Sequence, residues 1–153
     1  GGRFRVAGGG VGSGPLLDAP ISLTWDQAGS RLIVLQAGQV LAVDPISLNR
    51  SILADLSVAG FVIQPTSQIS CPPGEVYALV TLSSPLSLIE VSLTTGAATT
   101  HADMASAAGP PLTDILDVAT SAVRQTSYLL SQGSNSLHAL DGLGAEHVLF
   151  SRD

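Results

Sequence analysis

The chain has 153 residues, of which 45% are hydrophobic and only 12% are charged, a balance that excludes a disordered chain and a coiled coil. Six arginines, no lysine and twelve acidic residues give a net charge of −6. This charge argues against binding to nucleic acid or to anionic membranes, because both need a basic surface. The apolar residues fall in short runs, none of which approaches the roughly 18 residues of a membrane-spanning helix.

The composition also bears on the compartment. With so few charges, Ser, Thr, Gln and Asn must form most of the polar surface, as is common on secreted proteins, and we expect an extracellular or periplasmic location. Residues 1–5 lack the apolar stretch of a secretory signal, and Gly1 in place of Met predicts a processed chain or a piece of a longer one. Cys71 is the single cysteine, which excludes an internal disulfide and any site built on several cysteines.

Short strands separated by turns make up the first third of the chain. A connector rich in glycine, at 8–14, follows the first apolar run, and β-branched residues alternate with Gly and Pro about every eight to twelve residues. This punctuation favours strands and not helices. The strand-like runs lie at 4–7, 23–26, 32–35, 40–43 and 50–53.

The same order of runs recurs twice more. The later strand-like runs lie at 76–80, 88–91, 98–101, 128–130, 137–140 and 146–150. Arg3, Arg50 and Ala98 hold equivalent places, 47 and 48 residues apart, which is near the ~40–50 residues of a four-stranded propeller blade. We therefore expect residues 1–153 to form one β-propeller segment, with repeats at approximately 3–49, 50–97 and 98–145. Residues 146–153 would add a final outer strand.

The repeat resembles that of six-bladed NHL-type β-propellers. In that family a glycine-rich connector leads to a proline, an apolar inner strand and an aspartate before a turn. Residues 8–14, Pro20 and the run Leu23-Thr24-Trp25-Asp26 follow this order. The resemblance implies an all-β fold, a partial β-propeller of three four-stranded blades that is half of a six-bladed propeller.

A corner that closes each blade carries the rest of the resemblance. The family places Val-Asp before this turn and Thr-Gly with a nearby Arg after it, and the first repeat has Val43-Asp44-Pro45 and Asn49-Arg50. The second repeat keeps Thr95-Gly96 but has Ser92 for the aspartate, and the third keeps Leu140-Asp141. We expect the aspartate to accept hydrogen bonds from backbone N–H groups of the turn. We expect the connector glycines to adopt positive φ and to pass close to the central channel.

Three blades do not close a propeller, for which ~4–8 are typical. The expected partner is therefore the chain itself, in a homodimer or larger assembly, or further blades of a longer chain; no nucleic acid and no membrane insertion are expected. Residues 3–7 would form the outermost strand of a blade whose other strands lie elsewhere.

Several polar side chains are candidates for chemistry. His101 and Asp103, with Asp114 and Asp117, could bind a hard cation or supply a general base, although a solvated loop is the interpretation that we favour. The glycines at 8–14 are followed by no Lys-Ser or Lys-Thr, so they do not form a phosphate-binding loop. His138 and His147 lie on successive strand-like runs, without the third ligand that a metal site needs.

Three further residues are weaker candidates for a function. Cys71 takes the place that Asp26 holds in the first repeat, so we interpret it as a turn residue and not as a nucleophile. Asn49-Arg50-Ser51 satisfies the glycosylation sequon at a strand corner. Trp25, the only tryptophan, is too little for a surface that stacks sugar rings.

Six-bladed calcium-dependent hydrolases of the gluconolactonase and paraoxonase kind carry Glu and Asn ligands that face the channel. The chain's glutamates and the asparagines compared with them fall at expected turns or outer strands, so no ligand is carried over from that family. These residues are Glu75, Glu90, Glu146, Asn49 and Asn135.

The leading hypothesis is a non-enzymatic propeller scaffold or interaction module, with no catalytic, cofactor-binding or metal-binding residues and no cofactor. A calcium-dependent lactonase-like hydrolase, whose ligands lie in the missing blades, is one alternative. A structural subunit that assembles through open blade edges is another. The side chains expected in the core are Leu32, Val34, Val40, Ala42, Val76, Ala78, Val80, Leu88, Leu129, Leu137 and Ala139.

Overall fold

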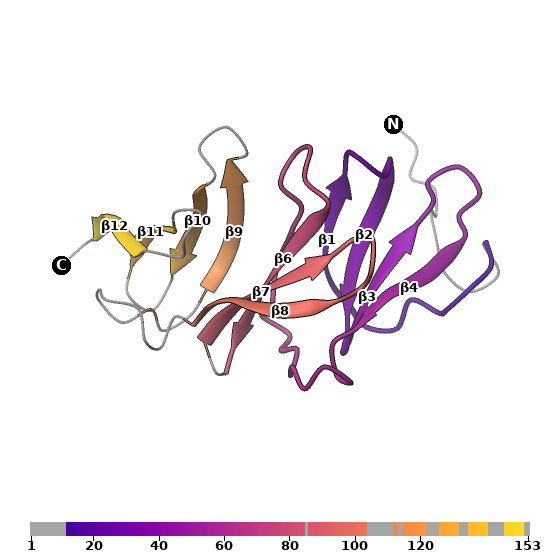
Figure 1. Cartoon of the computed structure of the whole chain (residues 1–153). Helices are drawn as coiled ribbons and strands as arrows, with labels where there is room; N and C mark the ends of the chain where they lie inside the picture. Colours follow the sequence, from indigo (N-terminus) through magenta and orange to yellow (C-terminus); the bar gives the residue numbers. More distant parts are fainter. Residues whose placement is uncertain are drawn as a thin grey trace, which may run out of the picture.

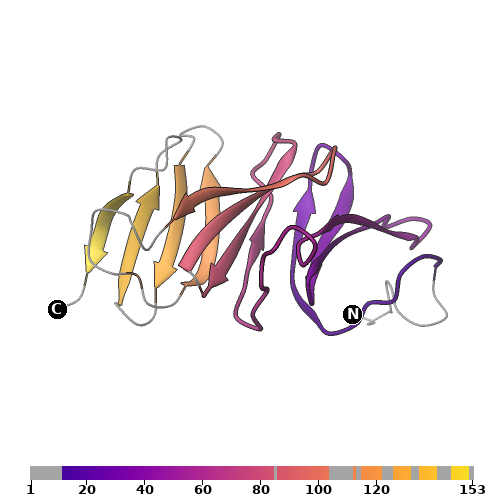
Figure 2. The same cartoon turned by 60° about the horizontal axis from the view of Figure 1, so that its bottom comes forward.

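The fold is known from a computed structural model that describes residues 12–84, 86–103, 112, 115–121, 126–131, 135–140 and 146–151, the last range for its backbone only. The described residues form twelve antiparallel strands and no helix, so none of them provides a helix that could cross a membrane. The strands make three four-stranded sheets, which confirms the predicted all-β partial propeller. Figures 1 and 2 show the sheets side by side in chain order, with sheet 1 at one end of the row and sheet 3 at the other. The expected strand at 3–7 lies outside the described residues.

Each sheet takes four consecutive strands. Sheet 1 contains β1 (Pro20–Asp26), β2 (Arg31–Gln36), β3 (Gln39–Val43) and β4 (Arg50–Asp55). Sheet 2 contains β5 (Ile69–Ser70), β6 (Tyr77–Ser83), β7 (Leu86–Ser92) and β8 (Ala98–Asp103). Sheet 3 contains β9 (Ile115–Ser121), β10 (Thr126–Ser131), β11 (Ser136–Leu140) and β12 (Glu146–Ser151). The sheets therefore divide the chain one strand later than the sequence repeats do, because the first strand of each later repeat closes the preceding sheet.

The first strands of the sheets lie next to one another. β5 contacts β1 on one side and β9 on the other, so the first strands of the three sheets lie next to one another, and we call them the central strands. β4, β8 and β12 are the last strands of their sheets. This is the order of blades in a propeller, in which the first strand of each blade lines the channel.

Apolar side chains fill the space between the sheets. Thirteen buried residues, among them Ile33, Leu35 and Val80, form the core between sheets 1 and 2. A second cluster, which includes Leu79, Leu88 and Leu129, joins sheet 2 to sheet 3. Strands with apolar side chains on both faces are what stacked sheets require, because each face of a middle sheet meets a neighbour.

Most of the predicted core is confirmed. Eight of the eleven side chains are buried, and Leu32 and Leu137 are half-buried. Val76 was predicted wrongly: it is exposed because it lies in the turn before β6, which begins one residue later at Tyr77.

The glycines of the described connector approach β4 and not the channel. Gly14 has φ +100°, and a Cβ there would lie 1.9 Å from the carbonyl oxygen of Arg50. The amide of Arg50 donates to the carbonyl of Ser13 at 2.8 Å, so the connector runs directly against the start of β4. The expectation of positive φ is confirmed at Gly12 and Gly14. The expected approach to the channel was wrong for these two glycines, which lie against the end of the corner and the start of β4, a contact that only glycine allows. The glycines at 8–10 lie outside the described residues.

Candidate functional site

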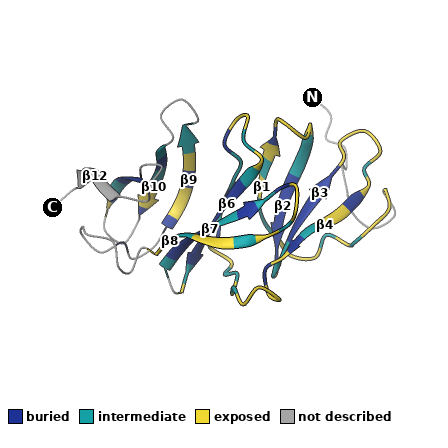
Figure 3. Ribbon diagram, in the orientation of Figure 1, coloured by how far each residue is buried: buried dark blue, intermediate teal, exposed yellow. Residues whose placement is uncertain are grey.

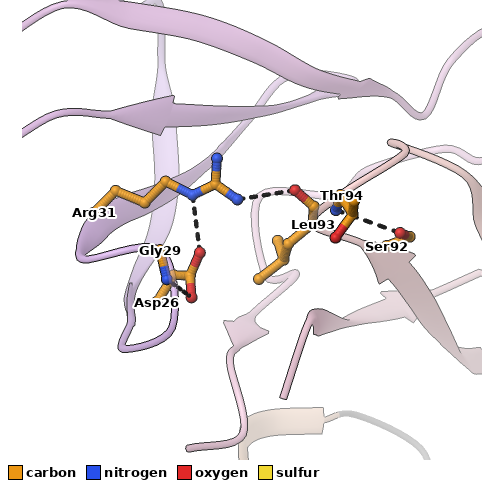
Figure 4. Close-up of polar contacts among 6 residues, drawn as sticks. All are labelled: Asp26, Gly29, Arg31, Ser92, Leu93 and Thr94. Atoms are coloured by element: carbon orange, nitrogen blue, oxygen red, sulfur yellow. Dashed lines mark hydrogen bonds and ion pairs between the residues drawn. The ribbon is translucent and has the colours of Figure 1, made fainter. Parts of the chain in front are cut away.

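The turn between β1 and β2 joins sheet 1 to sheet 2 through two charged side chains. Asp26 is buried; one carboxylate oxygen accepts the amide of Gly29 at 2.9 Å, and the other accepts Arg31 Nε at 2.8 Å. Arg31 also donates from Nη2 to the carbonyl oxygen of Leu93 at 2.8 Å, across to sheet 2 (Figure 4). Asp26 therefore does more than hold its own turn. It positions the guanidinium that bridges two sheets, a contact between residues 62 apart for which the sequence carries no signal.

The corner between β3 and β4 works as the sequence predicted. Asp44 Oδ1 accepts the amides of Ile46 at 2.7 Å and Ser47 at 2.9 Å, and these bonds hold the pKa of its carboxyl below the ordinary value. In sheet 2 the hydroxyl of Ser92 replaces this carboxylate and accepts the amides of Thr94 and Thr95, at 3.4 and 3.1 Å (the first is drawn in Figure 4).

The two corners also share a backbone conformation. The amide of Leu48 donates to the carbonyl of Asp44, and the amide of Gly96 donates to that of Ser92, each at 2.9 Å. Leu48 has φ +61° and Gly96 has φ +74°, so a leucine in the first corner occupies the left-handed place that glycine fills in the second. The first corner therefore contains strained backbone.

Cys71 is not built as a nucleophile. It is half-buried against the core between sheets 1 and 2, and burial, followed by the nearby Asp26 carboxylate, raises the pKa of its thiol to about 12. The prediction that Cys71 takes the place of Asp26 was wrong by one residue. Continuing the pairing of Ser70 with Leu79 places Pro72, and not Cys71, opposite Tyr77, as Asp26 lies opposite Arg31.

Two histidines contact other side chains than those that the sequence analysis grouped with them. His101 Nδ1 lies 3.1 Å from Glu90 Oε2 on the neighbouring strand, while Asp103 is exposed at the end of β8. His138 is fully buried and is hydrogen-bonded through Nε2 to Ser136 Oγ.

The other candidate cation ligands do not form a group among the residues that the structure describes. Asp114 and the side chain of His147 lie outside them, and Asp117 is exposed on β9. Within the described ranges, no three His, Cys, Asp or Glu side chains gather where they could hold a metal ion.

The residues compared with the calcium-dependent hydrolases lie away from the central strands. Glu75 is in the turn between β5 and β6, Glu90 is on β7, and Asn135 follows β10 with φ +46°. Glu146 begins β12. The sequon residue Asn49 accepts the amide and the hydroxyl of Ser13, each at 2.8 Å, so its Oδ1 holds the connector to the corner.

The two ends of the row of sheets carry exposed apolar side chains. On β1, Leu23 and Trp25 are 66% and 47% exposed and point away from sheet 2. The alternate residues face sheet 2: the hydroxyl of Ser22 accepts the amide of Ile69, and that of Thr24 accepts the amide of Cys71. On β10, Leu130 is 46% exposed, although its neighbour Leu129 is fully buried against sheet 2. Exposed positions on β1 and β9 are yellow in Figure 3. The sequence analysis named Leu23 and Trp25 within the repeat but did not predict that they and Leu130 are exposed, because only the packing of the sheets shows which apolar face is left uncovered.

The comparisons with known proteins agree with the architecture. No family model matches the sequence. No curated protein matches it either. Among solved structures, a chain of the nidogen/laminin complex is similar with a TM-score of 0.68 at 11% identity, over 88% of this chain and 49% of that one.

Two further solved structures are similar over most of this chain. The streptogramin B lyase has a TM-score of 0.62 at 10% identity, over 85% of this chain and 40% of its own. A calcium-binding protein, regucalcin from Agrobacterium tumefaciens, has a TM-score of 0.56 at 14% identity, over 97% of this chain and 49% of its own. These are β-propeller proteins, so the repeats are of the propeller type. The chain spans about half the length of the structures that it resembles, or less.

Proposed function

We propose that this chain is a non-enzymatic β-propeller interaction module of the NHL type, located outside the cell or in the periplasm. It provides half of a six-bladed ring and works by binding through the apolar faces at the two ends of its row of sheets. The observation that carries the proposal is the exposure of Leu23 and Trp25 on β1 of sheet 1. The equivalent face of sheet 2 is covered by sheet 1, and that of sheet 3 is covered by sheet 2.

The use of the polar side chains supports a structural role. Asp26 and Arg31 join two sheets, Asp44 holds a corner, and His138 is buried with Ser136. The thiol of Cys71 stays neutral at physiological pH, because its pKa is raised to about 12, and a neutral thiol is a weak nucleophile. The low charge and the absence of lysine support the proposed compartment.

A calcium-dependent hydrolase is the second candidate. The observation in its favour is that the similar structures include a calcium-binding protein and a puromycin hydrolase, the latter with a TM-score of 0.51 at 15% identity over 21% of its own chain. Among the described residues, Asp117, which is exposed on the central strand β9, is the candidate carboxylate for a channel ligand.

Thermal unfolding in Ca²⁺ and in a chelator separates the two functions. For the interaction module we expect the same Tm in both solutions, and no hydrolysis of lactone or ester substrates above that of buffer. A Ca²⁺-dependent rise in Tm that Asp117→Asn removes, and that Asp103→Asn on the outer strand β8 leaves unchanged, would contradict the proposal in favour of the hydrolase. Hydrolysis that requires Ca²⁺ would do the same.

A further inference from the structure

The end faces of the row repeat, position by position, the faces that are already buried between sheets 1 and 2. On β1, Leu23 pairs with Val34, and on β5, Ile69 pairs with Val80, so Leu23 and Ile69 hold equivalent places. Ile69 is only 5% exposed because sheet 1 covers it, whereas Leu23, with no sheet over it, is 66% exposed. The same count makes Trp25 equivalent to Cys71, which is half-buried in the core between the sheets.

The connector repeats as well. Gly14 and Gly60 both have positive φ, at +100° and +86°, and lie 46 residues apart, the spacing that also separates Leu23 from Ile69. Leu17 packs on sheet 1 as Ile63, the same 46 residues later, packs in the core between sheets 1 and 2. The connector therefore covers the outer part of the end face of sheet 1, and the uncovered part is the place where a neighbouring sheet packs in the internal interface.

The end face of sheet 3 matches the face of sheet 1 that meets sheet 2. Across β10 and β11, Leu130 pairs with Leu137 and Tyr128 with Ala139. Across β2 and β3, Leu35 pairs with Val40 and Ile33 with Ala42, and all four of these side chains are buried against sheet 2. The two strand pairs thus present the same apolar pattern. In sheet 3, however, Leu130 is exposed and Tyr128 and Leu137 are half-buried, and only the small Ala139 is buried.

From these equivalences we infer that the end face of sheet 3 docks on the end face of sheet 1 of a second copy of this chain, in the arrangement that sheet 1 already has with sheet 2. The inference rests on the proposed interaction function and names its partner. A two-fold axis along the channel then forms two identical interfaces and closes six sheets, which accounts for the similarity to propellers of about twice this length. Closure should bury at least ~1,000 Å², the size of a specific interface.

The side chains at the edge of this interface also fit. In the internal interface Ser22 Oγ accepts the amide of Ile69 at 3.3 Å and donates to Gln68 Oε1 at 3.1 Å. Counting along the strand pairs places Asp117 at the position of Ser22. Its carboxylate can therefore accept from the backbone of β1 in the second copy, at the place equivalent to Ile69.

The test uses the full chain and variants with aspartate in one face. Sedimentation over micromolar concentrations should show a dimer for the wild type. Leu130→Asp and Leu23→Asp should each raise its Kd by about 30-fold or more, the effect of losing an interface hot spot. Ile46→Asp, at a turn residue that is 93% exposed and belongs to neither face, should leave the Kd unchanged. Circular dichroism verifies that each variant is folded.

Mixing the two face variants makes the test specific. A ring of one Leu130→Asp chain and one Leu23→Asp chain has one doubly altered interface and one wild-type interface, so dimers should reappear in the mixture. Acrylamide quenching of Trp25, the only tryptophan, should decrease as the wild type dimerises. A wild type that stays monomeric, or a mixture that does not recover, would overturn the inference. Either result leaves the non-enzymatic function to be judged by the Ca²⁺ and hydrolysis experiments alone.

Discussion

Replacement of Ile33 by alanine should destabilise the protein more than the same change at Ile46. Ile33 is 0% exposed in the core between sheets 1 and 2, and Ile46 is 93% exposed in the corner after β3. The substitution removes three carbons, each worth about 0.8 kcal/mol of transfer free energy, and the cavity that remains adds to this cost. We expect Ile33→Ala to lower the free energy of unfolding by about 3–4 kcal/mol.

Urea denaturation, followed by far-UV circular dichroism at one protein concentration, measures the difference. Ile46→Ala is the matched control and should stay within about 0.5 kcal/mol of the wild type. If Ile33→Ala costs less than about 0.5 kcal/mol, or if the two substitutions cost the same, sheets 1 and 2 do not pack through this face and the account of the core is wrong.

Four further predictions follow from particular contacts. Leu129→Ala, in the core between sheets 2 and 3, should cost about 2–5 kcal/mol by denaturation, and a cost under about 0.5 kcal/mol would contradict the position of sheet 3. Leu48→Gly should raise stability by about 0.5–1 kcal/mol, because it relieves the positive φ of the corner; a lower Tm would argue against that conformation. Arg31→Gln and Asp26→Asn should couple by about 1–3 kcal/mol in a double-mutant cycle, whereas additive effects would show that the bridge is not formed. The raised pKa of Cys71 should reduce stability as the pH rises from about 9 towards about 12, since only the unfolded thiol ionises there; in Cys71→Ser this part of the pH dependence should be absent.

The strands were predictable because their signals are local. Alternating β-branched residues, with Gly and Pro between the runs, indicate where a strand begins and ends, and the period of the runs indicates a propeller. The role of Asp44 was predictable for the same reason, since its partners lie two and three residues away. Val76 was misplaced because an apolar residue at the end of a turn reads as the first residue of the strand that follows.

Contacts between distant residues could not be read from the sequence. Arg31 reaches Leu93 only because sheets 1 and 2 stack, and no residue pattern near either one indicates the bond. The candidate interaction faces are of the same kind. Leu129 was correctly predicted in the core, but the exposed apolar surface at the adjacent Leu130 was not, because it depends on the packing of sheet 3 on sheet 2.

The native mass of the wild-type chain at micromolar concentration tests the central claim most directly. Six sheets closed by two copies predict a particle of twice the 15.5 kDa of one chain, which dissociates on dilution. A stable particle with the mass of one chain at every concentration would contradict closure by a second copy.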